Sequence, residues 1–392
     1  MTSAAHDQSR TRVRGHLPRT SGPAHRINLH FATRVISNVY PKIVRFLFIL
    51  LGLLGQLGAA DLCGSIRTLV AAESKRQDIP GISVAVVRNN HVVCSITQGW
   101  ADLEQLVPNT TKSRHRLASL SKPITAVLTM KLAEEGKVAL GDSIRKRMPE
   151  LPPWYEGVTI ERLLSHQSGI REYSDMSEVF STQHYSNLEE AARAIFVESP
   201  LLFEPGAKTA YTTYGYTLLG AALERATGQS FKQILEARLP DFSLDDFGTL
   251  TPSRVRPYRN SASMRWENAP AFDASNKYPG GGIVSTAVEY ANFLIQVSSG
   301  RLLRKESVAA MWTRQSLSDG SLVPYATLGW ATGVRGDQRY FTHGGLQPGT
   351  TTVMHWFPDL GSGSVILSNA EGPELDGLQE RILEIVVGRK PQ

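Results

Sequence analysis

Two cysteines, Cys63 and Cys94, are all that the 392-residue sequence contains. Their spacing does not fit metal ligands, and their number is far below that of a disulfide-stabilised scaffold. They are either free thiols in a core or one disulfide. The sequence also lacks zinc-ligand spacing, a Walker loop and a dinucleotide-binding fingerprint. No metal and no other cofactor is therefore expected.

The body of the chain has no excess of positive charge, although the sequence pI is near 9.3. Eight basic residues lie before Phe46, where Asp7 is the only acid. The remainder has 34 Lys and Arg against 35 Asp and Glu. Nucleic-acid-binding surfaces typically carry a basic stripe with interleaved aromatic residues, and this part of the sequence contains none. Nucleic acid is therefore not expected as a partner.

A long apolar run is missing as well: residues 46–60 form a run of 15, whereas a membrane-spanning helix needs about 20 residues. The run follows an Arg-rich, acid-poor segment and ends in small residues. We predict that residues 1–60 are a targeting leader. Three interpretations stay open: a transit peptide for mitochondrial import toward the intermembrane space, a secretory signal, or a short membrane anchor at 46–60. Asn109-Thr-Thr111 is a glycosylation acceptor that only the secretory route would use.

Hydrophobic periodicity predicts both helices and strands in the rest of the chain. Helical spacing occurs at 62–70, 159–164, 188–197 and 375–385, and β-rich runs occupy 81–87, 91–96, 328–334, 339–343, 350–357 and 364–368. The helical period dominates between about 116 and 239, whereas 240–276 is loop-rich and stays unassigned.

These elements predict a protein of the α/β (α+β) class. One antiparallel sheet is built from both ends of the chain and flanked by N- and C-terminal helices, with an all-helical subdomain inserted. We expect the sheet-containing subdomain to comprise 61–115 and 260–392 and the mainly helical one 116–259. The active site is expected between them.

Ser119 and Lys122 lie three residues apart at the predicted start of a helix. Positions i and i+3 share a helix face, so the Lys122 nitrogen can reach the Ser119 oxygen. A lysine accepts the proton of an attacking serine where burial or nearby cations favour its neutral form. One apolar face follows in the same helix until Gly136 (Ile124, Val127, Leu128, Leu132). The pair alone is weak evidence, because this spacing is common by chance.

Two later stretches add residues suited to a cleft. Tyr211 follows a Pro-Gly turn and precedes a predicted helix, in a Tyr-x-Thr213 arrangement. His343 is followed by two glycines, which let a substrate backbone approach a strand. His166 is interpreted as a structural hydrogen-bonding residue rather than as a base.

Ser-x-x-Lys, Tyr-x-Thr and His-Gly-Gly occur in this order, and with them the chain resembles a known family. It is similar to the serine β-lactamase-like family of class C β-lactamases, D-alanyl-D-alanine carboxypeptidases and related esterases. The stretches 163–170, 211–220 and 280–286 look especially like its animal mitochondrial members. The resemblance runs from about residue 79 to about 386 and implies the β-lactamase/transpeptidase-like fold.

The resemblance implies a role for each matching residue. Ser119 would be the nucleophile that forms an acyl-enzyme, Lys122 would help to deprotonate it, and Tyr211 would be the general base or proton shuttle. Four further residues would bind the substrate: Thr213, His343, Gly345 and Leu346. The oxyanion would lie between the backbone amides of Ser119 and Leu346.

Two departures from the family pattern bear on the substrate. Thr213 replaces an asparagine that contacts the acylamide of the substrate, and His343 stands where many relatives have lysine. Both favour a peptide or small acyl ester over a β-lactam. The leading hypothesis is a serine hydrolase of the peptidase or esterase type; the alternative is a catalytically weak scaffold or binding protein. Membrane association through 46–60 and a homo-oligomer are compatible with either.

Overall fold

The computed structural model describes residues 61–261 and 266–388. The predicted leader at 1–60, with its apolar run at 46–60, lies outside these residues. Among the described residues, no helix has the length and hydrophobicity that a membrane crossing requires.

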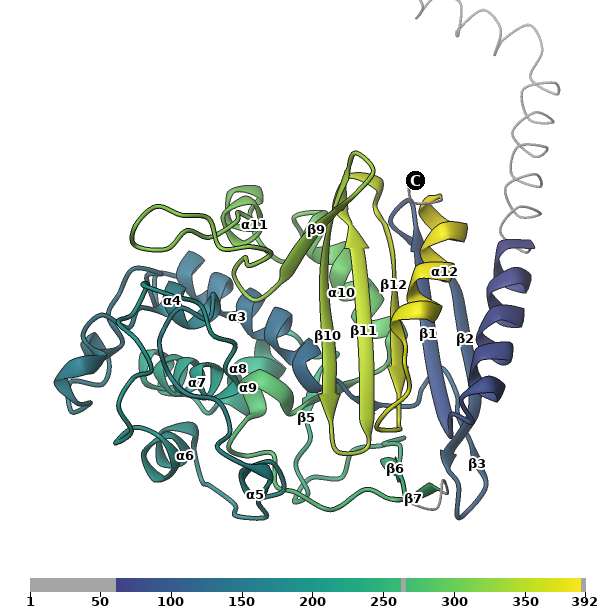
Figure 1. Cartoon of the computed structure of the whole chain (residues 1–392), viewed down its shortest axis with the longest axis horizontal. Helices are drawn as coiled ribbons and strands as arrows, with labels where there is room; N and C mark the ends of the chain where they lie inside the picture. Colours follow the sequence, from purple (N-terminus) through teal and green to yellow (C-terminus); the bar gives the residue numbers. More distant parts are fainter. Residues whose placement is uncertain (1–60, 262–265, 389–392) are drawn as a thin grey trace, which may run out of the picture. The chain divides into compact units, whose positions relative to one another are not determined.

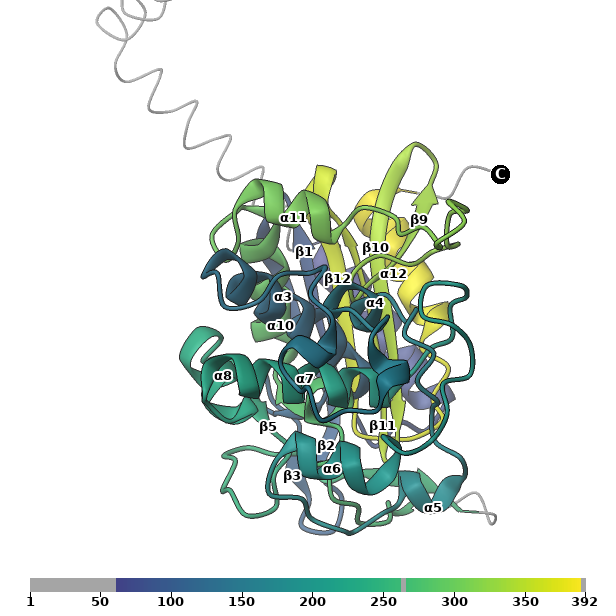
Figure 2. The same ribbon diagram turned by 90° about the vertical axis from the view of Figure 1, so that its left-hand side faces the viewer.

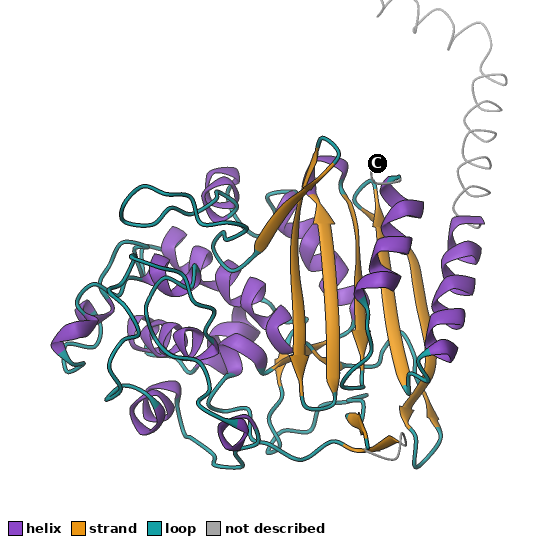
Figure 3. Cartoon of the chain, in the orientation of Figure 1, coloured by secondary structure: helices purple, strands orange, loops and turns teal. Residues whose placement is uncertain are grey.

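A seven-stranded sheet forms the centre of the described part (Figures 1 and 3). Its strands lie in the order β3-β2-β1-β12-β11-β10-β9, and all neighbours are antiparallel. The bounds are β1 Gly81–Arg88, β2 His91–Asp102, β3 Val107–Pro108, β9 Ala331–Arg335, β10 Gln338–Gln347, β11 Thr350–Phe357 and β12 Ser362–Ser368. Because β1 pairs with β12, the prediction of one sheet built from both ends of the chain is confirmed.

The turns of the sheet follow from backbone preferences. Asn89 and Asn90 join β1 to β2 with φ of 52° and 60°, a left-handed conformation that asparagine tolerates and that two-residue hairpins require. At the other edge, the strand expected at 328–334 begins only at Ala331. Gly329 has φ 84°, a left-handed value outside the range of regular extended strand, and its amide donates to the Leu164 carbonyl at 3.1 Å.

Helices cover both faces of the sheet. Because side chains alternate along a strand, β1 presents one set of residues to each face. Ile82, Val84 and Val86 of β1 pack with the helix at 61–76 and with α12 (Asp376–Val387). The alternate side chains of β1 belong to a second cluster that includes α10 (Ala287–Ser298). Figure 1 shows α12 in front of the sheet and α10 behind it.

The two cysteines form one disulfide, which resolves the question that the sequence left open. Cys63 lies in the helix at 61–76 and Cys94 in β2, and their Cα atoms are 5.6 Å apart, an ordinary distance for this bond. The disulfide therefore ties the first described helix to the sheet.

The helical region lies beside the sheet, and Figure 2 shows α6, α7 and α8 in front of the strands. The remaining α-helices are α3 Ser121–Glu134, α4 Ile160–Leu164, α5 Met176–Val179, α6 Leu188–Ile195, α7 Thr213–Thr227, α8 Phe231–Arg238, α9 Tyr278–Gly281 and α11 Lys305–Met311. The described residues also form the 3-10 turns η1 Ala118–Leu120, η2 Ile144–Lys146, η3 Pro153–Tyr155 and η4 Pro358–Leu360. These helices, with the antiparallel sheet, confirm the predicted fold class.

Two small sheets complete the described elements. The first has the order β4-β8-β5, and the second pairs β6 with β7. The bounds are β4 His115–Arg116, β5 Ser243–Leu244, β6 Tyr258–Asn260, β7 Trp266–Asn268 and β8 Ile283–Ser285. Three of these strands lie in or next to the unassigned range 240–276 and are only two or three residues long, too short to show a period of two.

Helix α3 differs from the sequence prediction in its burial. One apolar face was expected, but residues 121–130 and Leu132 are all buried. The helix is central: it contacts α7, α8, α9 and α11. Polar residues on its other faces are therefore enclosed as well, among them Ser121, Lys122 and Thr125.

Candidate active site

Ser119 lies in a 3-10 turn immediately before α3 rather than in the helix itself. The preceding Ala118 has φ 48°, an uncommon conformation for a residue with a side chain. Such strain persists only where surrounding contacts enforce it, and it is frequent at active sites. The predicted contact between Ser119 and Lys122 nevertheless forms, since Lys122 Nζ lies 3.2 Å from Ser119 Oγ.

Lys122 is fully buried and its amino group is surrounded by oxygen atoms. Nζ donates to Ser119 Oγ at 3.2 Å, to Thr213 Oγ1 at 3.4 Å and to the Gly280 carbonyl at 2.8 Å. Three acceptors match the three protons of an ammonium group. Nζ also lies 4.6 Å from the ring centroid of Tyr211, where a cation is attracted to an aromatic face.

Tyr211 is the second side chain that contacts Ser119 Oγ. It stands just before α7, whose N-terminus is fixed by Thr212, since the Thr212 side chain accepts from the Gly215 amide at 3.1 Å. Tyr211 Oη donates to Ser119 Oγ at 2.7 Å. The serine oxygen is thus within hydrogen-bond distance of both a phenol and an amine.

His166 supports the segment that carries Tyr211. Its Nδ1 accepts from the Thr212 amide at 3.2 Å, and its ring lies 4.5 Å from that of Tyr211. Burial, with a smaller contribution from Lys122, lowers the pKa of His166 well below its usual value. The contact agrees with the interpretation of His166 as a structural hydrogen-bonding residue.

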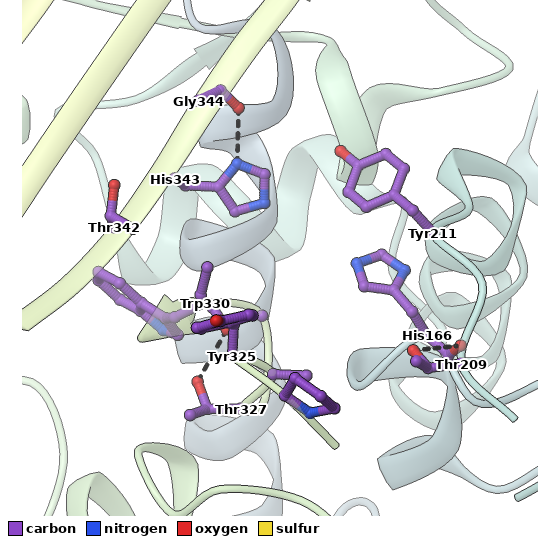
Figure 4. Close-up of a pocket in the computed structure, with 13 residues that line it drawn as sticks. His166, Thr209, Tyr211, Tyr325, Thr327, Trp330, Thr342, His343 and Gly344 are labelled. Carbon is purple, nitrogen blue, oxygen red and sulfur yellow. Dashed lines mark hydrogen bonds between the residues drawn. The ribbon is translucent and has the colours of Figure 1, made fainter. Parts of the chain in front are cut away.

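His343 faces Tyr211 from β10, with 6.3 Å between the ring centroids (Figure 4). Its Nδ1 donates to the Gly344 carbonyl at 2.6 Å. Burial, followed by the charge of Lys122, lowers the pKa of His343 to about 4. The imidazole is therefore neutral at neutral pH, and its Nε2 remains an acceptor.

Gly345, two residues after His343, lets β10 pack against the turn that carries Ser119. A Cβ on Gly345 would lie 2.8 Å from the Leu117 carbonyl and 3.0 Å from the Ala118 Cβ, and would also meet Thr352 Oγ1. Only a glycine lets the strand pass this close to the residues before Ser119. Leu346 follows with a side chain that is 66% exposed.

Three cavities meet at Tyr211. The histidine pocket, drawn in Figure 4, measures about 310 Å³ and has aromatic walls (His166, Tyr325, Trp330, His343). The lysine pocket measures about 240 Å³ and opens from Ser119 toward α5 and α9 (Tyr173, Phe180, Lys277, Gln347). A third cavity of about 670 Å³ also reaches Ser119 (Thr352, Glu374, Asp376).

The structure brings all seven predicted site residues to this junction, but sequence reasoning missed Gly280 and Lys277. The Gly280 carbonyl accepts from Lys122, and a Cβ on Gly280 would lie 2.8 Å from Thr213 Cγ2. The run of three glycines at 280–282 was a signal for such close packing. Lys277 gave no signal, because it directly follows the unassigned range 240–276 and belongs to no periodic segment.

No group of three or more His, Cys, Asp or Glu side chains within 61–261 and 266–388 could hold a metal ion.

Residues 66–388 match the protein family described as Beta-lactamase. The chain therefore belongs to the β-lactamase family, generally a family of serine hydrolases, and the predicted resemblance is confirmed. One relative is the serine beta-lactamase-like protein LACTB, mitochondrial, of Homo sapiens, which is 26% identical over 77% of this chain and 71% of its own length. Protein flp of Staphylococcus aureus strain MW2 is 31% identical over 43% of this chain and 34% of its own.

Solved structures are similar to this chain in fold. The octameric penicillin-binding protein homologue from Pyrococcus abyssi superposes with a TM-score of 0.73 at 22% identity, covering 84% of this chain and 78% of its own. The D-amino acid amidase from Ochrobactrum anthropi SV3, complexed with D-phenylalanine, gives 0.71 at 22%, covering 83% and 99%. At this identity the likeness concerns the fold alone.

Proposed function

We propose that the protein is a serine hydrolase that acts through an acyl-enzyme on a peptide amide or a small ester. One observation carries the proposal: Ser119 Oγ lies 2.7 Å from Tyr211 Oη and 3.2 Å from Lys122 Nζ. A nucleophile within hydrogen-bond distance of a base that is held in place by a third group is the general signature of covalent catalysis.

In the proposed reaction Ser119 Oγ attacks the carbonyl carbon of the substrate while its proton passes to Tyr211 in its deprotonated form, the phenolate, which reverses the hydrogen bond between the two oxygens. Lys122, with its three protons directed at three oxygens, supplies the positive charge that stabilises this phenolate. Collapse of the tetrahedral adduct breaks the bond to the amine or alcohol, which takes the proton from Tyr211. Water then attacks the acyl carbon and gives its proton to Tyr211. The bond between that carbon and Ser119 Oγ breaks, the free acid leaves, and Tyr211 returns the proton to Ser119 Oγ.

The oxyanion of the tetrahedral adduct would lie between the backbone amides of Ser119 and Leu346. The packing of Gly345 against Leu117 and Ala118 supports this pairing, because it holds β10 next to the serine. Removing one donor from an oxyanion hole costs on the order of a hundredfold or more in rate.

The proposed substrate is an open-chain amide or an ester rather than the cyclic amide of a β-lactam. Thr213 has no side-chain amide like that of the asparagine in the family pattern. Its hydroxyl accepts from Lys122 at 3.4 Å, and its backbone amide donates to Glu172. The neutral His343 supplies no permanent cation where many relatives have lysine.

Turnover of a panel of p-nitrophenyl esters and peptide anilides tests the proposal. We expect the wild type to hydrolyse at least one of them, and Ser119→Ala to reduce kcat by about a thousandfold or more. Retained hydrolysis in Ser119→Ala would contradict the role of Ser119. Folded wild type that turns over none of the panel would favour the scaffold alternative.

We also propose mitochondrial localisation, with 1–60 as the transit segment and the intermembrane space as the destination. The support is the mitochondrial relative together with the basic, acid-poor leader. A homo-oligomer is a further proposal, supported by the octameric structural neighbour. The division into subdomains at 61–115 with 260–392 and at 116–259, with the site between them, is retained as a proposal.

A further inference from the structure

The lysine pocket has one apolar wall and a small set of polar groups. Tyr173, Met176, Val179 and Phe180 form the apolar wall beside Ser119. Lys277 and Gln347 line the same pocket. A pocket of this composition suits a ligand with an apolar body and one polar end.

Lys277 is unusual because a lysine is almost never fully buried without a partner. Its residue is only 3% exposed. It is fixed relative to the reaction centre, since it precedes α9 directly and the Gly280 carbonyl of α9 accepts from Lys122. A group held by Lys277 would therefore have a defined position relative to Ser119.

The protein leaves most of the hydrogen-bonding capacity of Lys277 unused. Nζ donates to the Val179 carbonyl at 3.3 Å and lies 4.1 Å from the ring centroid of Phe272. Among the described residues it has neither a further hydrogen-bond acceptor nor an ion-pair partner. An ammonium group has three donors, so two remain for a ligand.

The charged groups around Lys277 have other partners. Asp245 is paired with Arg116 at 2.7 Å, Asp273 with His184 at 2.8 Å, and Glu172 accepts from the Thr213 amide. Glu371, which also lines the pocket, accepts from the Gly349 amide at 3.4 Å. None of these carboxylates neutralises Lys277 by direct contact.

A second donor in the pocket is unpartnered. Gln347 Nε2 is buried and has no hydrogen-bond partner within the part of the chain that the structure describes. Buried donors without acceptors are rare in native proteins, and at a binding site a ligand oxygen can satisfy them. Lys277 and Gln347 thus offer donors to the same space. Glu172 and Glu371 also line the pocket, and each accepts from a backbone amide rather than from these two donors.

We infer that Lys277, assisted by Gln347, binds a carboxylate on the acyl part of the substrate while the apolar wall holds its hydrocarbon body. The inference rests on the proposed acyl transfer at Ser119 and adds its substrate class: acyl groups that end in a carboxylate. A purely structural lysine, held by Val179 and Phe272, would give no preference between charged and neutral acyl groups.

The protonation of Lys277 adds a signature in pH. Burial first, and then the charge of Arg116, lower the pKa of Lys277 to about 7, while Asp245, Glu172 and Asp273 act in the opposite direction. The free enzyme therefore carries the cation below about pH 7 and loses it as the pH rises. Selectivity for a carboxylate must fall over the same range.

Two p-nitrophenyl esters of equal chain length test the inference: the monoester of adipate, which is anionic, and the hexanoate, which is neutral. We expect the ratio of their kcat/KM values to favour adipate in the wild type at pH 6. It should fall by about tenfold to a hundredfold in Lys277→Met, as expected for the loss of a charged hydrogen bond. It should also fall in the wild type between pH 6 and 8.5, and Lys112→Met, which removes an exposed lysine, should keep the wild-type ratio.

An unchanged ratio in Lys277→Met, with hexanoate hydrolysed, would overturn the inference and leave the proposed function intact. If the wild type hydrolysed neither ester, the proposed function would be contradicted. The inference would then be tested by ligand binding. Calorimetry with Ser119→Ala at pH 6 should show tighter binding of adipic acid monoamide than of hexanamide, and Lys277→Met in the same background should abolish the difference. Equal binding of the two amides would overturn it.

Discussion

The amino group of Lys122 has only uncharged groups as its direct partners. Lys122 is enclosed by oxygen atoms and by the faces of Tyr211 and Tyr216. His343 and His166 have lowered pKa values, in part because of this lysine, and stay neutral near pH 7. The substrate-binding role expected for His343 stays a prediction, in which its neutral ring would offer Nε2 as an acceptor and no charge.

The lowered pKa of His343 predicts a loss of stability in acid. The pKa of His343 is about 4 in the folded protein, against 6.5 for an ordinary imidazole, so the unfolded chain binds more protons between these two pH values. The free energy of unfolding should therefore fall as the pH drops from 6.5 to 4. His343→Gln should make this fall smaller, as measured by urea unfolding at pH 4.5 and 7.

The exposed His91 is a matched control, because His91→Gln removes a histidine that is not enclosed by the fold. An equal acid dependence in the wild type and His343→Gln would contradict the lowered pKa of His343.

At the residue scale, sequence alone indicated the nucleophile and its neighbours because their spacing is local or follows a family pattern. Ser119 and Lys122 are three residues apart, and Tyr211 precedes a helix. Lys277 could not be predicted, because its importance depends on burial beside Phe272 and on the absence of an ion-pair partner among the described residues. Both properties exist only in the folded chain.

At the scale of elements, the contact of β10 with the turn before α3 sets the geometry at Ser119. Gly345→Ala would place a methyl group against the Leu117 carbonyl and the Ala118 Cβ. We expect a loss of about 1–3 kcal/mol in the free energy of unfolding, as for other overpacked sites, and a lower kcat because the serine is displaced. Urea unfolding and ester turnover measure the two effects.

Gly344→Ala is the comparison variant, since a Cβ there would meet only the Thr352 carbonyl, at 3.9 Å. It should keep the wild-type stability. If both alanine variants were equally stable, the close approach at Gly345 would not be a constraint.

The disulfide predicts a redox-dependent stability for the helix at 61–76. The bridge joins cysteines 31 residues apart, and closing a loop of this length in the unfolded chain corresponds to about 3–4 kcal/mol. Reduction should lower the free energy of unfolding of the wild type by about this amount. The double variant Cys63→Ser/Cys94→Ser should be insensitive to reductant, and a wild type equally insensitive would exclude the bridge.

Elements with a clear period were predicted best. The hairpin, the late strands and the closing helix were expected near their observed positions, because alternation and helical spacing reflect one buried face. The full burial of α3 was not predicted, because its polar residues are enclosed by neighbours from distant parts of the chain. The short strands β5, β6 and β7 have no period to detect.

At the scale of the whole molecule, the pairing of β1 with β12 makes the sheet continuous between the two ends of the described chain. The prediction of this architecture followed from strands at both ends and helices between them. The boundaries at 116 and 259 remain predictions. The reaction centre nevertheless draws residues from η1, α3, α7, α9 and β10, so it depends on the complete fold.

The structure also changes the meaning of the glycosylation acceptor. Asn109 is only 7% exposed, and its Nδ2 donates to the Ile82 carbonyl at 2.8 Å. A glycan on this nitrogen is incompatible with the fold. An unglycosylated Asn109 is therefore expected on either route, and the mature N-terminus becomes the better evidence on targeting.

Acyl transfer at Ser119 can be tested by peptide mapping with mass spectrometry after treatment of the protein with a fluorophosphonate. Trypsin should release residues 117–131 as one peptide, because Lys122 is followed by Pro123. We predict that this peptide carries the phosphonyl group on Ser119 and that Ser119→Ala carries none. An unmodified wild type, or an adduct on another residue that persists in Ser119→Ala, would contradict the account.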